Sequence, residues 1–312
     1  MHRKLFAMNP ATGMSRRYRL ERRRHNVAVW VALATLIATL GGWAPSTAAA
    51  WAIAIVAIAV GLPHGALDIV IGPRLGRPTL FFGLYAAVML GVVLVWLSFP
   101  VLGLVAFLIS SWYHFARGDA VHHGDLSSAG GLLGVSTAGC AIGLPLLLHA
   151  SVVTPILSDL MLGTAVLTPD QVARFGSVIA APSLLAGLLA GLAAMRIGRY
   201  SAVVEIAIIA ILAATVHPLV SFAIYFALWH APRHLITLDI DRAAWGRAVF
   251  TTAATLLVGA FVWRLIEPAA PVAARVVFIG LAALTGPHLL LTELEMFRKT
   301  SQFTTDKGIL IS

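Results

Sequence analysis

The stretch 79-TLFFGLYAAVMLGVVLVWLS-98 decides the fold, because it runs for 20 residues without a charged side chain. A helix of that length crosses the hydrocarbon core of a bilayer, which is about 30 Å thick. The whole chain shares this character, since 59% of its 312 residues are hydrophobic and only 11% are charged. Long apolar runs favour membrane helices over the short alternating strands of a barrel. The sequence therefore predicts an all-α, polytopic integral membrane bundle.

Apolar runs of similar length recur along the chain and predict about eight to ten transmembrane helices. The count stays open because only His217 and Pro218 separate the seventh run from the eighth, and a proline there fits either a break or a kink. The expected spans are 27–44, 50–72, 79–98, 101–117, 130–149, 174–195, 201–216, 218–237, 248–265 and 272–293.

Positive charge is concentrated at the N-terminus. The first 24 residues hold eight Lys and Arg and one acid, and so contribute +7 of the formal net charge of +9. Because the rest of the chain is nearly neutral, the basic balance does not indicate nucleic-acid binding. Arginines recur in alternate short loops, so the positive-inside tendency predicts that both termini are cytoplasmic. We expect a basic arm over 1–26, a membrane domain over 27–297 and a cytoplasmic tail over 298–312, in the inner (plasma) membrane.

Five of the eleven histidines fall inside predicted spans, where an ionisable side chain is costly and usually faces the bundle interior. The four spans that carry them all run from outside to inside in this topology. Each histidine lies in the later part of its span, so all five are expected at one depth, in the cytoplasmic half of the bilayer. Several neutral imidazoles at one level indicate a metal site. The five are His64, His114, His230, His234 and His288.

The stretch 226-FALWHAPRHLI-236 carries two of these histidines. His230 and His234 are spaced i and i+4, so both project from one helix face and can reach one ion. Pro232 lies between them and disturbs the local helix, which makes the ideal spacing an approximation. Arg233 points away from His234 and is expected as an interfacial cation or as a partner of the ligands. Two ligands from this helix and one from each of two others predict a four-histidine site.

The metal is not fixed by these residues. Imidazole suits zinc, copper, iron and nickel. The single cysteine, Cys140, excludes an intrachain disulfide and a cluster of thiolate ligands. An all-histidine site buried among apolar helices can hold ferrous iron with positions left open for oxygen chemistry on an apolar substrate.

Two carboxylates lie close to the histidines in sequence. Asp68 follows His64 by four residues, and it can accept the outer N–H of a ligand histidine and fix the tautomer of that ring. Pairing of Asp68 with Arg74 is an equally good alternative. Asp119 is expected at the membrane interface, beside Arg117.

Four motifs, each containing one or two of the histidines, resemble the Brp/Blh family of bacterial and archaeal membrane proteins, known as β-carotene 15,15′-dioxygenases. The resemblance extends over about residues 50–297 and keeps the motif order of the family. The motifs are 63-PHGALD-68, 112-WYHFARGD-119, 229-WHAPRH-234 and 286-GPHLLLTE-293.

The resemblance implies a non-haem Fe(2+) enzyme that cleaves the central 15,15′ double bond of β-carotene with O2 and releases two all-trans-retinal molecules. By motif, the implied iron ligands are His64, His114, His230 and His234. His288 matches a family histidine, and it is expected either as a ligand or, like Asp68, as a residue that supports the ligands. The implied partners are a carotenoid taken from membrane lipid and O2, with a retinal-binding rhodopsin as a downstream recipient.

Aromatic residues next to the motif histidines are candidates for substrate binding. β-Carotene is an apolar rod that dissolves in the bilayer, so an enzyme acting on it needs a long apolar path to the metal. The predicted contacts with the polyene are made by Trp112, Tyr113, Phe226 and Trp229.

Three other functions are compatible with membrane histidines. A di-iron desaturase or hydroxylase acting on a lipid would need several histidine boxes, whereas this chain has one HxxxH and an isolated HH pair at 122–123. A b-type haem protein could use His64 and His230. A transporter could use histidines as relay groups.

Overall fold

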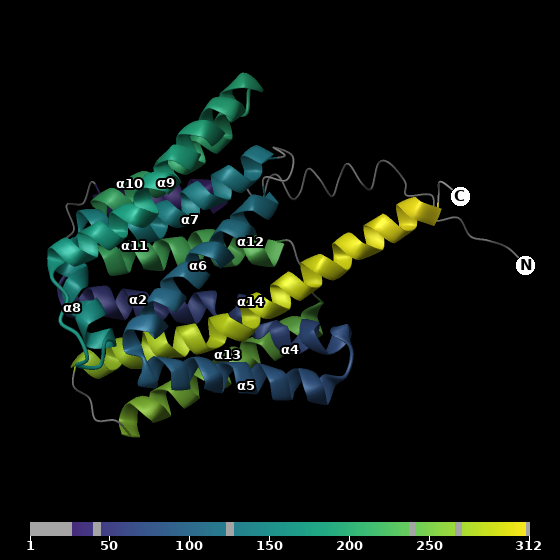
Figure 1. The fold of residues 1–312 in the computed structure, drawn as a ribbon, viewed down its shortest axis with the longest axis horizontal. Coiled ribbons are helices and arrows are strands. Elements are labelled where there is room, and N and C mark those ends of the chain that lie inside the picture. The colour runs from purple at the N-terminus through teal and green to yellow at the C-terminus, as the bar shows by residue number, and fades with distance from the viewer. Residues whose placement is uncertain (1–26, 40–44, 123–127, 237–240, 266–269, 310–312) are drawn as a thin grey trace, which may run out of the picture.

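The structure is a computed structural model that describes residues 27–39, 45–122, 128–236, 241–265 and 270–309 (Figure 1). Within these ranges all regular structure is helical, so the predicted all-α fold is confirmed. Six of the described helices are long and apolar enough to cross a membrane. The basic arm lies outside the described residues, and the direction of the chain across the membrane stays a prediction.

The helices follow one another with short connections. They are α2 (Thr47–Gly61), α3 (Pro63–Ala66), α4 (Asp68–Ile71), the 3-10 turn η1 (Gly72–Leu75), α5 (Pro78–Ser98), α6 (Pro100–His122), α7 (Ser128–Leu148), α8 (Ala150–Leu160), α9 (Pro169–Arg196), α10 (Tyr200–Thr215), α11 (Pro218–Ile224), the π-helical turn η3 (Tyr225–His230), α12 (Ala231–Ile236), α13 (Arg242–Leu265) and α14 (Ala270–Ile309). A further helix precedes them over Val27–Thr39.

Helix α7 packs closely against α6, α9 and α10. Small residues make this possible, because a Cβ on Gly143 would meet the backbone of Ala180 on α9 at 2.7 Å. Such close approach of backbones is the usual way in which membrane helices associate. On the other side of the molecule, α14 packs against α5 and α6, and its C-terminal end extends beyond the other helices (Figure 1).

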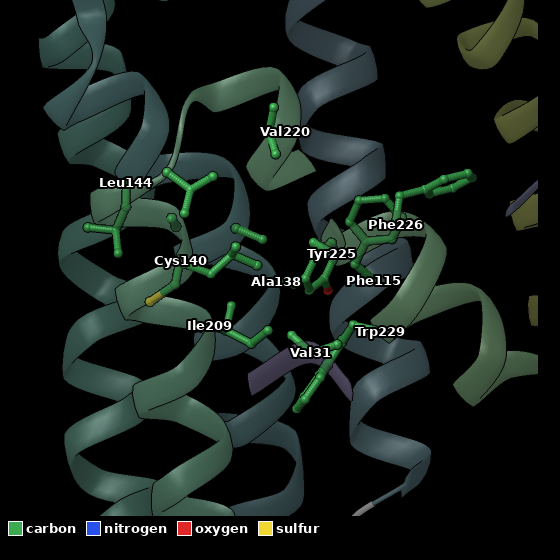
Figure 2. Close-up of a cluster of buried hydrophobic side chains, with 14 of the residues drawn as sticks. Val31, Phe115, Ala138, Cys140, Leu144, Ile209, Val220, Tyr225, Phe226 and Trp229 are labelled. Carbon is green, nitrogen blue, oxygen red and sulfur yellow. The ribbon is translucent and has the colours of Figure 1, made fainter. Parts of the chain in front are cut away.

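The largest hydrophobic core lies between α6, α7, α10 and the turn η3 (Figure 2). Phe115, Tyr225, Phe226 and Trp229 are all buried in it and lie close together in the close-up. Helix α5, in contrast, contributes little to the core, since Trp96 is the one buried residue along its full described length. A helix that is apolar on every face and yet exposed is suited to contact lipid.

Helix α8 departs from the prediction, because residues 150–173 fall between two expected spans, 130–149 and 174–195. Val153, Leu157 and Leu160 recur at helical spacing and are buried against α9 and α14. An apolar face of that kind is stabilised by packing, even in a segment too short to cross a bilayer. At the C-terminus, α14 continues as a helix to Ile309 through most of the predicted cytoplasmic tail, whose side of the membrane stays a prediction.

Two irregular places in the helices position histidines of the predicted site. The first is at Pro63, because the helix is interrupted there and resumes as α3 and α4. The second place is η3, where the Ala231 N–H bonds to the Phe226 carbonyl five residues earlier. Pro232 cannot continue a regular α-helix without a clash, and a wider π-helical turn accommodates it. Turns of this type are frequent at functional sites.

Candidate metal centre

The five histidines expected at one depth meet at one place, although four segments of the chain that are far apart in sequence carry them. His64 lies at the centre, with its ring centroid 5.2 Å from that of His230, 5.6 Å from His234 and 5.4 Å from His288. The His114 ring lies 4.9 Å from His230 and 4.8 Å from His288. All but His234 are buried, and His234 is partly buried. The predicted cluster is therefore present in the fold.

The tightest part of the cluster is formed by His64, His114 and His230, whose possible ligand atoms all lie within 4.8 Å of one another. The Nε2 atoms of His114 and His230 are only 3.2 Å apart. Two imidazole lone pairs at that distance repel each other unless a proton or a cation lies between them. A divalent metal ion meets this requirement for all three rings at once.

The outer nitrogens of two rings are held by acceptors. The Nδ1 atom of His64 lies 2.5 Å from the Gly61 carbonyl, which can only accept, so Nδ1 carries the hydrogen and Nε2 keeps its lone pair. His288 Nδ1 lies 2.9 Å from both carboxylate oxygens of Asp68. A metal-ligating histidine usually donates its second N–H in this way, which fixes the tautomer and the ring orientation. The donor set thus fits a transition metal.

Asp68 serves a different histidine from the one that its spacing suggested. It follows His64 by four residues, yet its carboxylate faces His288 on α14 and accepts a further hydrogen bond of 3.0 Å from Tyr85 on α5. The short helices α3 and α4 turn Asp68 away from His64, because the helix is interrupted between them at Leu67. Among the residues that the structure describes, no hydrogen bond or ion pair joins Asp68 to the alternative partner, Arg74.

A second group of buried polar residues surrounds Asp119. The sequence had placed Asp119 at the membrane interface. That expectation is wrong: Asp119 is fully buried and its Oδ2 accepts hydrogen bonds from Thr137, Tyr225 and Trp229. Arg117 pairs with Glu293 on α14 instead, at the partly exposed edge.

Arg233 belongs to the same buried group and is not interfacial. It is 2% exposed, donates to Glu205 on α10 at 2.7 Å and lies 3.9 Å from Asp119. Its guanidinium is stacked 3.5 Å above the ring of Trp229. Sequence reasoning missed this group, and the only hint was the occurrence of Asp119 and Arg233 within the same motifs as ligand histidines.

An apolar cavity of about 240 Å³ opens beside the histidines. His64, His114 and His288 form part of its surface, and most of the remainder is aliphatic or aromatic. Phe222 and Phe226 stack in parallel with their centroids 5.7 Å apart, and Phe226 meets His64 at 5.5 Å. The cavity also reaches α5 and α13, so helices distant in sequence enclose it.

The four predicted substrate contacts divide between this cavity and other surroundings. Phe226 lines the cavity, together with Phe115 and Phe222. The other three are absent from its lining: Tyr113 is 45% exposed, Trp112 donates its indole N–H to the Val135 carbonyl, and Trp229 donates to Asp119.

Comparisons with known proteins agree with the motif resemblance. A family model described as Beta-carotene 15,15'-dioxygenase matches residues 53–294, which include all five histidines and Asp68. The protein named Beta-carotene 15,15'-dioxygenase from Uncultured marine bacterium 66A03 is 27% identical over 266 residues, covering 78% of this chain and 92% of that protein. No solved structure matches the chain.

Proposed function

The chain belongs to the β-carotene 15,15′-dioxygenase family, and from that premise we propose that its histidine cluster holds the ferrous iron used to cleave β-carotene. Members of this family are oxidoreductases that cleave carotenoids, and this chain is a multi-pass membrane protein. To this family membership the proposal adds four points: the metal, its ligands, the central position of cleavage, and the inner (plasma) membrane as the location.

Four histidines are proposed as iron ligands: His64, His114, His230 and His234. Three of them have possible ligand atoms within 4.8 Å of one another, and the His234 ring lies 5.6 Å from that of His64. Imidazole is a ligand that iron accepts, and open positions leave room for a second reactant. Bound iron supplies the one-electron chemistry that O2 requires.

The cavity beside the cluster is proposed to bind the polyene. Its aromatic and aliphatic lining favours an apolar chain and excludes water from the reacting bond. Phe226 fixes one side of the space next to His64, with the two rings 5.5 Å apart. A carotenoid is longer than this cavity, so its ends must extend between the surrounding helices towards lipid. That placement would bring the middle of the polyene nearest to the histidines.

The proposed reaction balances without another reductant. The central carbon–carbon double bond breaks, and each of its two carbons takes one atom of O2 and becomes an aldehyde. Two identical retinal molecules leave the site. The residues of the chain have no proton to supply in this overall conversion, which agrees with an apolar cavity.

A haem between two histidines is disfavoured by the packing. A b-type haem would need its two axial rings on opposite faces of a planar macrocycle. The rings of His64 and His230 are 5.2 Å apart and meet edge to face, which leaves no space for such a group between them.

The observation that carries the proposal is the convergence of three ligand nitrogens beside an apolar cavity in a chain of this family. Expression in cells that make β-carotene should bleach the cells and yield retinal in the extract. Purified protein should contain about one iron per chain and show no haem absorbance. Unchanged β-carotene would contradict the activity, and activity that persists without any bound transition metal would contradict the metal site.

A further inference from the structure

We propose that His288 is a further ligand of the metal, held in place by Asp68 and Tyr85. This inference rests on the proposed metal site and adds to it a ligand from α14 with its own hydrogen-bonded support. It gives a function to three residues that the four-histidine set leaves unused.

The position of His288 is at least as close to the cluster as that of His234. Its ring centroid lies 4.8 Å from His114 and 5.4 Å from His64. The corresponding distances for His234 are 6.3 Å and 5.6 Å. If ring proximity qualifies His234 as a ligand, it qualifies His288 more strongly.

The two nitrogens of His288 have opposite surroundings. Nδ1 lies 2.9 Å from both oxygens of Asp68, and a carboxylate accepts, so this nitrogen carries a hydrogen. Nε2 is buried and has no hydrogen-bond partner among the described residues. A buried polar atom without a partner is destabilising, and native proteins rarely retain one without a function. A metal ion would satisfy the Nε2 lone pair.

Tyr85 extends the support of His288 to a third helix. Its hydroxyl donates to Asp68 Oδ2 at 3.0 Å, so the carboxylate on α4 is held between α5 and α14. Carboxylate–histidine–metal arrangements orient the ring and make the ligand nitrogen more basic. Tyr85 and Asp68 are therefore positioning residues, and His288 is the ligand.

Metal titration of purified full-length protein tests this inference without using activity. Co2+ serves as the probe, because its visible absorbance changes with the number and type of ligands. His288→Asn is the sharpest variant, since its amide can replace Nδ1 towards Asp68 while the inward nitrogen is lost. We expect H288N to bind Co2+ more than about 100-fold more weakly, since loss of a ligand costs more than loss of its support, and with an altered visible spectrum.

The positioning residues should have graded effects in the same titration. Asp68→Asn should weaken Co2+ binding about 10- to 100-fold, as loss of a ligand's carboxylate partner usually does. Tyr85→Phe should weaken it by less than about tenfold, because it removes a single hydrogen bond. Thr292→Val is the matched control on α14, since its hydroxyl bonds to Leu289 in its own helix, and it should leave Co2+ affinity unchanged.

The outcomes separate this inference from the function on which it rests. If the wild-type protein binds no transition metal, the proposed metal site is wrong. If the wild type binds Co2+ and H288N binds it with the same affinity and spectrum, His288 is not a ligand. If H288N does not fold, the D68N and Y85F variants provide the test. If these two variants have lower thermal stability but bind Co2+ with wild-type affinity and spectrum, the inference is overturned.

Discussion

At the scale of single residues, the histidines show what a sequence can and cannot reveal. Their depth in the spans predicted the cluster, because polar groups in an apolar bundle must face one another. The pairing of His288 with Asp68 could not be predicted, since 220 residues separate them. Asp119 was misplaced because a carboxylate near a helix end usually meets water. Its three buried donors come from helices whose rotation the sequence does not fix.

The first prediction concerns His234, whose ring lies at the edge of the cluster. His234→Ala should lower metal affinity by more than about 100-fold and abolish cleavage, since loss of a ligand costs more than loss of its support. Metal content per chain and retinal yield measure this effect. Membrane insertion should be unchanged, because the variant has one polar group fewer. Full activity of H234A would remove His234 from the ligand set.

A second prediction concerns Gly61, which lies against the ring of Phe226. A Cβ at this position would overlap that ring, so Gly61→Ala must displace Phe226 from its place in the cavity. We expect the protein to be destabilised by about 1–3 kcal/mol. Cleavage should be about 10- to 100-fold slower, because a displaced Phe226 would misplace the substrate. The metal should be retained.

Gly91→Ala is the control for the Gly61 variant. Gly91 lies on α5 with nothing within 4 Å of an added Cβ, so this substitution should neither destabilise the protein nor slow cleavage. Equal rates for the two alanine variants would show that the position of Phe226 does not matter to catalysis.

At the scale of elements, the segment from Tyr225 to Ile236 combines a π-helical turn, a proline and a buried arginine. The sequence indicated a disturbed helix from Pro232, and the structure has its widened turn just before that residue. Arg233 connects this segment to α10 through Glu205 and stacks on Trp229. These contacts fix the rotation of the segment that presents His230 and His234.

The third prediction follows from this buried ion pair. Arg233→Met would leave the carboxylates of Glu205 and Asp119 buried without their cation, which should destabilise the protein by about 3–5 kcal/mol. Thermal unfolding in detergent measures the effect. Arg117→Met breaks the partly exposed pair with Glu293 and should cost at most about 1 kcal/mol. Equal losses in the two variants would contradict the importance of the buried pair.

At the scale of the whole molecule, most of the fold could be predicted from the length of apolar runs. Where the structure describes them, the spans before His149 and those after Pro169 correspond to observed helices within several residues at their ends, except that α14 continues well past 293 to Ile309. The missed helix α8 is too short to be recognised as a span, and its stability comes from burial of Val153 and Leu157 against other helices. Tertiary packing of this kind is not visible in the local sequence.

The fourth prediction concerns orientation, which the arginine-rich loops indicate. With both termini cytoplasmic, a fluorescent protein that matures only in the cytoplasm should be bright when fused after Ser312. A phosphatase that is active only outside the inner membrane should be inactive at the same position. The reverse pattern would place the C-terminus outside and would invert the predicted depth of the histidines.

Helix α5 has one more consequence, because it touches the cavity through Tyr85 and Met89 while burying Trp96 alone within the protein. If the cavity binds the carotenoid as proposed, one helix separates it from the acyl chains, and the substrate need never enter water. The fraction of enzyme molecules with carotenoid in the cavity would then depend on the mole fraction of carotenoid in the surrounding lipid. Diluting the proteoliposome membrane with extra lipid, at constant total carotenoid and enzyme, should slow turnover in proportion when the enzyme is below saturation. Adding buffer alone should leave the rate per enzyme unchanged.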